Sequence, residues 1–233
     1  MTEDLEIETY LSISNSIIGI YLFDIKRLKN LYKNEIKIEN QSNILDTNIL
    51  NSFLEENVFK IEKLLGEFIN NIYLIVENNK TNNIYFGIKK KVYGNKIDKK
   101  YLENLLTDAK DLFNENYKNE KIMHMLINAY IANGKQFKSF EQITNGNDLC
   151  VELEFKSISL DFVSNLENIL KKYQISILDF LDGNYVKNFF NNDKEISKMT
   201  FDILNGCNEN EVMVVQKNTK KLGFFEKFFN LFD

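Results

Sequence analysis

The 233 residues of this sequence include 29 Lys and Arg against 34 Asp and Glu, and the net charge of -5 argues against a broad surface for nucleic acid. Hydrophobic residues make up 44% of the chain, enough to bury at least one core. The two cysteines, Cys150 and Cys207, lie far apart without neighbouring histidines, which suits reduced cytosolic thiols and offers no metal site. The acidic segment 1–10 lacks a signal-peptide pattern and no apolar run is long enough to span a membrane, so we expect a cytoplasmic protein.

The first 48 residues favour a small meander of strands, followed by a helix. Apolar and β-branched residues cluster between short polar turns, one of them at Asn15-Ser16. The strands are expected at 9–14, 17–24 and 31–38. A polar link at 41–48 leads into a helix expected at 49–69, and Asn70-Asn71 is expected to end it. Its apolar face would carry Leu50, Phe53, Leu54, Val58, Ile61, Leu64, Leu65 and Phe68.

Residues 97–137 show the clearest local pattern in the chain. Asp98 can cap a helix whose apolar residues recur every three or four positions. From Lys121 the period falls towards two, as in a strand, and Asn133-Gly134 offers a tight turn into Gln136-Phe137. The segment is therefore predicted to be helix, strand, turn and strand. The other elements expected are strands at 72–77, 84–92, 149–157 and 175–181, and a helix that Asp161 caps and that runs to Tyr173.

This order of elements resembles the subdomain that is specific to FtsA, an actin-like protein of bacterial cell division. The resemblance rests on the segments ENLLTDAK at 103–110 and KIMHMLINAYIANGK at 121–135, and it covers roughly 53–190. It implies an α+β fold with an FtsA-type inserted subdomain, an actin-like N-terminal strand meander and a C-terminal amphipathic helix. The expected domains are the meander at 1–48, the FtsA-specific subdomain with flanking elements at 49–190, a linker at 191–221 and the helix at 222–233.

The resemblance also implies a phosphate loop of the form Asp-x-Gly-Thr between the first strands. Ser12, Ile13, Ser14 and Asn15 stand at the corresponding place. They include neither the acidic residue that would help to position a metal nor the glycine that lets the backbone approach phosphate. About fifty residues follow the last expected strand, too few for a second nucleotide-binding half. The loop therefore lacks the groups that nucleotide binding at this place requires, and the sequence leaves open whether a nucleotide binds elsewhere. We expect no cofactor, no metal and no enzymatic activity.

The segment after the lysine-bearing tether at 216–221 is rich in phenylalanine. On a helix Phe225, Phe228, Phe229 and Phe232 fall at i, i+3, i+4 and i+7, while Glu226 and Asp233 lie towards the opposite side. The residues predicted to bind an anionic membrane surface are Leu222, Phe224, Phe225, Lys227, Phe228, Phe229, Leu231 and Phe232. The same apolar face could instead pack on the core of the protein, and the resemblance favours the membrane because FtsA ends in a targeting helix.

Other polar residues are assigned structural or surface roles. The single histidine, His124, is expected to be a satisfied structural imidazole in a strand. Glu209 and Glu211 could bind a cation, but a solvated loop is the simpler interpretation. The remaining acidic pairs are expected on the surface: Glu55 and Glu56, and Glu152 and Glu154.

The resemblance implies a role in cell division without ATPase chemistry. The chain would tether a ring of the FtsZ-like polymer to the cytoplasmic face of the membrane at the division site, or recruit later division proteins, with self-association left open. Three alternatives remain: an adaptor for pilus or secretion assembly of the actin-like scaffold group, a nucleotide hydrolase with an unrecognised site, and a soluble α+β binding module.

Overall fold

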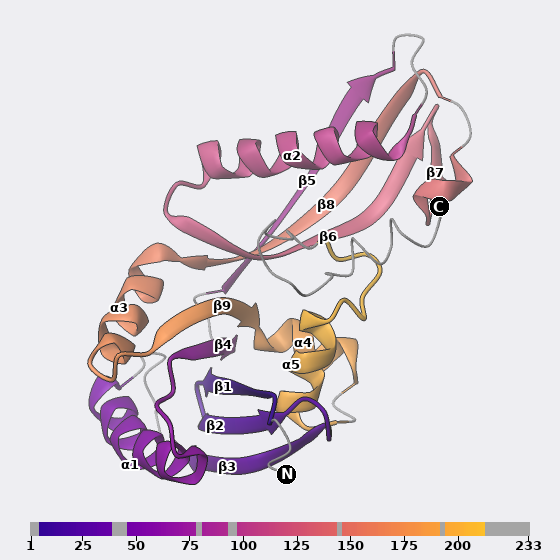
Figure 1. Ribbon diagram of the computed structural model, residues 1–233. Helices are drawn as coiled ribbons and strands as arrows, with labels where there is room; N and C mark the ends of the chain where they lie inside the picture. The colour runs from indigo at the N-terminus through magenta and orange to yellow at the C-terminus, as the bar shows by residue number, and fades with distance from the viewer. Residues whose placement is uncertain are drawn as a thin grey trace. The chain divides into compact units, whose positions relative to one another are not determined.

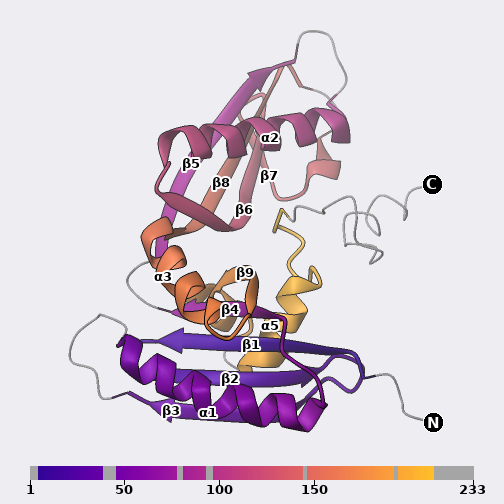
Figure 2. The same cartoon turned by 60° about the vertical axis from the view of Figure 1, so that its left-hand side comes forward.

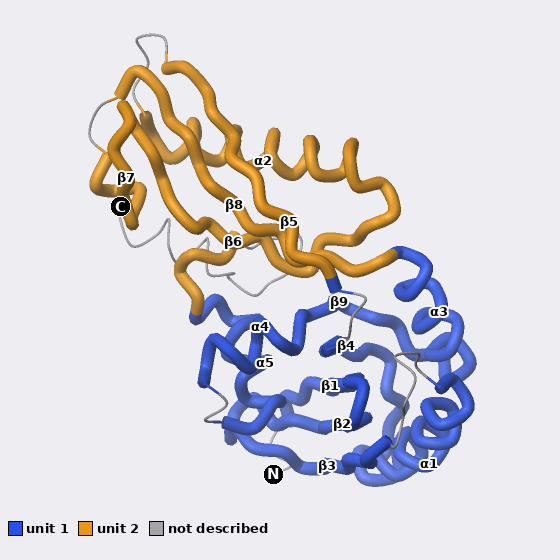
Figure 3. Tube along the Cα trace, turned by 180° about the vertical axis from the view of Figure 1, so that it is seen from behind, with its two compact units in different colours: residues 1–81, 160–207 blue, residues 82–159, 208–233 orange. Residues whose placement is uncertain are grey.

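The computed structural model describes residues 5–38, 46–77, 81–92, 97–143, 146–191 and 194–212. The chain divides into two compact units, 1–81 with 160–207 (unit 1) and 82–159 with 208–233 (unit 2), shown in two colours in Figure 3. Each unit has its own sheet and at least one helix, so the predicted α+β class is confirmed. Within the described residues, no helix is both long and apolar enough to cross a bilayer.

Unit 1 is built on a mixed five-stranded sheet with the order β3-β2-β1-β4-β9 (Figure 1). Its strands are β1 (Ile7–Ser14), β2 (Ile17–Asp24), β3 (Lys29–Lys37), β4 (Asn71–Glu77) and β9 (Ser176–Asp182). The first three strands pair antiparallel as the predicted meander, whereas β4 runs parallel to β1 and β9 runs parallel to β4. The centres of β1 and β2 are buried at consecutive positions, as expected for strands covered on both faces.

Helices cover both faces of this sheet. They are α1 (Thr47–Leu65), α3 (Leu160–Lys171), α4 (Gly183–Phe189) and α5 (Ile196–Leu204). On one face, the buried Asn57 of α1 accepts hydrogen bonds from Tyr32 and Asn34 of β3, each 2.7 Å long. Figure 2 shows α1 lying along these strands. On the other face, Phe201 of α5 packs on Phe23 of β2 with ring centroids 5.6 Å apart.

Two helix boundaries differ from those expected. α1 ends at Leu65 and not at Ile69, because Gly66 adopts a left-handed conformation, with φ 74°, that stops the helix. α3 begins at Leu160, so Asp161 lies in its first turn and is not its cap. By contrast, α2 (Lys99–Asn116) begins where predicted, and the Asp98 side chain accepts a hydrogen bond from the Tyr101 backbone N–H.

The compact units do not follow the domain boundaries expected from the sequence. The range 49–190 was expected to be one subdomain, but α1 and β4 at its start and β9 near its end belong to unit 1. Pairing of β4 with β1 and β9 joins segments far apart in the chain, which local periodicity cannot reveal. Part of the expected linker is helix α5, with Met199 and Ile203 buried.

Unit 2 is a four-stranded sheet with the order β5-β8-β6-β7, with α2 packed on one face. Its strands are β5 (Thr81–Lys91), β6 (Glu120–Ala132), β7 (Lys135–Phe137) and β8 (Asp148–Ser159), and a short 3-10 helix, η1 (Phe140–Gln142), follows β7. Asn133 and Gly134 both have positive φ, as the predicted tight turn requires. The ring of Phe155 stacks between those of Phe86 and Phe113, at centroid distances of 4.9 and 4.8 Å.

Candidate functional site

The carboxyl ends of the three parallel strands of unit 1 form the candidate site. Ser14 ends β1, Glu77 ends β4 and Asp182 ends β9. The register brings these ends together. Ser14 pairs with Glu77, and Val76, which precedes Glu77 in β4, pairs with Asp182. Ligands of open α/β sheets bind at this edge. The chemistry of the edge therefore depends on what these side chains and their neighbours contact.

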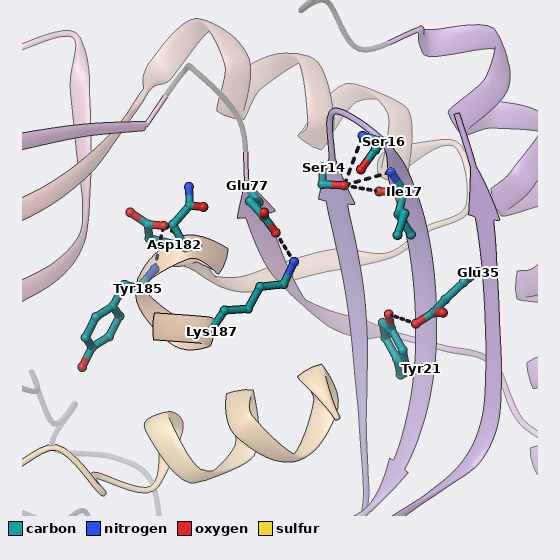
Figure 4. A network of polar contacts seen from close by, with 10 residues as sticks. Ser14, Ser16, Ile17, Tyr21, Glu35, Glu77, Asp182, Tyr185 and Lys187 are labelled. Carbon is teal, nitrogen blue, oxygen red and sulfur yellow. Dashed lines mark hydrogen bonds and ion pairs between the residues drawn. The ribbon is translucent and has the colours of Figure 1, made fainter. Parts of the chain in front are cut away.

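Ser14 is engaged within the turn between β1 and β2 (Figure 4). Its Oγ accepts hydrogen bonds from the backbone N–H groups of Ile17, at 2.9 Å, and Ser16, at 3.3 Å, and donates one to the Ile17 carbonyl at 3.0 Å. Of the other residues at the place of the phosphate loop, Ser12 and Ile13 lie within β1 and are buried. The turn is thus held by side-chain hydrogen bonds of its own.

The other two strand ends contact helix α4. Glu77 forms an ion pair with Lys187 of α4, and both side chains are only partly exposed. Asp182 is buried, and its Oδ1 accepts hydrogen bonds from the backbone N–H groups of Asn184, at 2.8 Å, and Tyr185, at 3.1 Å. Asp182 therefore caps the N-terminus of α4. These contacts appear side by side in Figure 4.

Close packing brings the start of α4 against β4. A Cβ atom added at Gly183 would lie 3.0 Å from Glu77 Cβ and 3.2 Å from Ile75 Cγ2. Glycine therefore allows a close approach between the β9–α4 junction and β4. A phosphate-bearing ligand at this edge would have to compete with the Glu77–Lys187 pair and the Asp182 cap.

A buried tyrosine and a carboxylate lie on the neighbouring strands. Tyr21 Oη of β2 donates a hydrogen bond of 2.6 Å to Glu35 Oε1 of β3. Burial, followed by this hydrogen bond and the negative charge of Glu35, raises the pKa of Tyr21 well above its ordinary value. The phenol is therefore held in its neutral, hydrogen-donating form. This fits a structural role for the pair.

In unit 2 the structure gives His124 a carboxylate partner. His124 Nδ1 lies 2.6 Å from Glu211 Oε1, and the two side chains are 2% and 9% exposed. The structural role predicted for His124 fits this contact, but the solvated loop expected at Glu211 is wrong. The backbone explains the burial: Ile127 N–H donates to the Asn210 carbonyl and Val212 N–H to the Met125 carbonyl, both at 2.8 Å. The segment 208–212 thus pairs along the edge of β6. Glu211 stands 87 residues after His124 in the sequence, so no local pattern indicates that the two side chains meet.

The remaining acidic residues mostly lie where they were expected. Glu209, Glu55, Glu56 and Glu152 are exposed. Glu154 differs, because it is half-buried and accepts hydrogen bonds from Lys156 Nζ at 2.8 Å and Tyr85 Oη at 3.1 Å. Among the described residues, no group of three or more His, Cys, Asp or Glu side chains is arranged to hold a metal ion.

The residues predicted to bind a membrane lie outside the described part of the chain. They are Leu222, Phe224, Phe225, Lys227, Phe228, Phe229, Leu231 and Phe232. Their role stays a prediction.

The chain is therefore an α+β protein of two units, and the sheet of unit 1 is mixed. No protein family and no curated protein matches the sequence. Among solved structures, the chain is similar to a PilM–PilN complex of type IV pilus biogenesis, with TM-score 0.47 and 10% identity over 78% of this chain and 49% of that one. It is also similar to the cytoplasmic domain of EpsL, an inner-membrane component of the type II secretion system of Vibrio cholerae, with TM-score 0.35 and 8% identity over 76% and 56%.

A third solved structure is a Bacteroides thetaiotaomicron protein of unknown function with an actin-like ATPase fold. Its TM-score is 0.31, with 12% identity over 81% of this chain and 59% of that one. The chain thus spans about half to three fifths of the length of these three structures.

Proposed function

We propose that this chain acts by binding, as an adaptor built on one half of an actin-like body with unit 2 inserted between β4 and α3. The strand order supports the actin-like part of the proposal. The three antiparallel strands β1–β3 fit the actin-like N-terminal strand meander that the resemblance implies. This is an analogy of fold, and function must be argued from the site.

The observation that carries the proposal is the carboxyl edge of the unit 1 sheet. Its polar side chains are engaged by the chain itself: Ser14 in its turn, Glu77 with Lys187, and Asp182 with the start of α4. The α4 N-terminus, which could otherwise attract a phosphate, is capped by a carboxylate. These contacts favour a scaffold whose strand ends serve packing.

Titration of ATP with Mg²⁺ into the full chain tests this proposal. We expect no saturable heat of binding, and no change on Lys187→Ala or on the control Lys172→Ala at an exposed position. Saturable binding that Lys187→Ala weakens while Lys172→Ala does not would overturn the adaptor in favour of the nucleotide hydrolase.

In the finer role that we propose, the chain is an adaptor for a membrane-associated assembly of the pilus or secretion kind, the type of system to which EpsL and the PilM–PilN complex belong. The membrane contact would be made by the residues predicted between Leu222 and Phe232. The FtsZ tether of cell division is the second proposal. A fluorescent fusion of the full chain separates them, because the tether must concentrate at division sites and the assembly adaptor need not.

A further inference from the structure

Unit 2 contains an open apolar groove beside the segment 208–212. It lies between α2, β6, η1 and this segment, and has a volume of about 170 Å³. Its apolar lining belongs to the unit 2 core or packs against it: Leu102, Leu106, Ile127, Tyr130, Phe140 and Val212. We call it the α2–β6 groove.

The size of the groove indicates what it can accept. Apolar cavities of roughly 150 Å³ are large enough to bind benzene, whereas pockets for drug-sized ligands measure about 300 to 1,000 Å³. A groove of about 170 Å³ therefore suits one phenyl ring. Since the groove is open along one side, the ring can be presented by a longer segment that stays outside.

The course of the chain places a phenylalanine-rich segment within reach. Val212 lines the groove and is the last described residue. Residues 213–221 separate it from Leu222, and an extended chain of this length spans at most about 30 Å. Because the tether starts at the groove itself, the segment 222–233 can return to it without any rearrangement of unit 2.

Charge also favours this occupant. Glu103, Glu141 and Glu209 stand on the rim of the groove, alongside Lys99 and Lys138. The approaching segment carries lysines in its tether and its helix: Lys217, Lys220, Lys221 and Lys227. Three rim carboxylates against two rim lysines favour a lysine-bearing segment, although exposed pairs of this kind contribute little each.

We propose that the α2–β6 groove binds a phenylalanine ring of the segment 222–233, and so holds this segment away from the membrane until a membrane surface competes for it. Docking of the phenylalanine ring depends on the groove alone, whereas competition between the groove and a membrane rests on the proposed membrane-bound adaptor. Full burial of one Phe side chain shifts the equilibrium between the released and the docked segment towards docking by about tenfold or more.

Limited trypsin digestion of the full chain tests the docking. Cleavage after Lys227 should be about tenfold slower in the natural sequence than in Leu102→Glu, which places a charge in the groove. Cleavage after Lys217, in the tether, serves as the internal control. Ser139→Tyr narrows the groove from a half-exposed position without adding a trypsin site, so it provides the same test if Leu102→Glu fails to fold. If a folded groove variant is cut after Lys227 no faster than the natural chain, the docking proposal is overturned.

Flotation with anionic vesicles separates this proposal from the membrane anchor. If both hold, Leu102→Glu increases the floating fraction while Phe228→Glu/Phe229→Glu abolishes it. Slow cleavage that the groove variants relieve, with no variant floating, supports docking and overturns the anchor. Equal flotation of the natural chain and Leu102→Glu, together with equal cleavage, overturns docking and leaves the anchor in place.

Discussion

At the scale of single residues, buried polar side chains hold distant parts of each unit together. His124 and Glu211 join β6 to the segment 208–212, and Asn57 joins α1 to β3. The sequence predicts that His124 is structural, because it stands alone among apolar residues in a strand. It does not predict Glu211 as the partner, because Glu209 and Glu211 look alike in a polar run and only the pairing of 208–212 with β6 distinguishes them.

Glu211→Ala should lower the free energy of unfolding by about 1 to 3 kcal/mol, since it removes a close acceptor from a buried imidazole. Glu209→Ala is the matched control, because Glu209 is exposed, and it should change stability by less than about 0.5 kcal/mol. Urea denaturation of both variants measures the difference. An equal loss of stability in the two variants would show that the His124–Glu211 contact does not stabilise the fold.

Tyr130 should make the protein less stable at high pH. Burial, and then the charge of Glu141, raises the pKa of Tyr130 to about 12. The pKa of a tyrosine in the unfolded chain is near 10. The contribution of Tyr130 to the free energy of unfolding is therefore fully present below pH 10 and is lost as pH rises towards 12. About 1.4 kcal/mol should be lost by pH 11.

The variant Tyr130→Phe isolates this contribution, because it keeps the ring that packs near Phe140 and removes the titrating group. Urea unfolding at pH 9 and pH 11 should show a smaller loss of stability in Tyr130→Phe than in the natural chain. The same loss in both proteins would mean that Tyr130 does not titrate as described.

At the scale of elements, hydrophobic periodicity predicts most of the fold. The meander β1–β3, the helix α2 and the turn at Asn133-Gly134 lie at or within a few residues of their predicted positions. The end of α1 was misplaced because the apolar pattern continues through Ile69, while the conformation of Gly66 ends the helix. The start of α3 was misplaced because Asp161 suits the first turn of a helix as well as its cap.

Gly66 should therefore resist substitution by branched residues. Nothing lies within 4 Å of a Cβ added there, so the cost comes from the left-handed backbone alone. Gly66→Val should destabilise the protein by about 1 to 2 kcal/mol or more, and Gly66→Asn by less, because Asn tolerates this conformation. Thermal unfolding ranks the two variants. If Gly66→Asn cost as much as Gly66→Val, backbone strain would not be the cause.

At the scale of the whole molecule, the division into units could not be predicted from the sequence. Parallel pairing of β4 with β1 and β9 places unit 2 as an insertion between β4 and α3, and these pairs are separated by many residues. The candidate site follows from the same pairing. Ser14 was identified at the place of the phosphate loop, whereas Glu77, Asp182 and Lys187 were not, because only the assembled sheet brings them to one edge.

The adaptor that we propose binds at a membrane surface through the residues predicted between Leu222 and Phe232. Flotation of the full chain with anionic liposomes tests it most directly, with Phe228→Glu/Phe229→Glu as the variant that removes the apolar face. Burying several Phe side chains, each worth about 1.5 to 3 kcal/mol when complete, exceeds the cost of folding a short helix. We predict that the natural chain floats, that Leu102→Glu floats more strongly and that the double variant stays in solution. Failure of both the natural chain and Leu102→Glu to float, while each remains folded, would contradict the membrane adaptor.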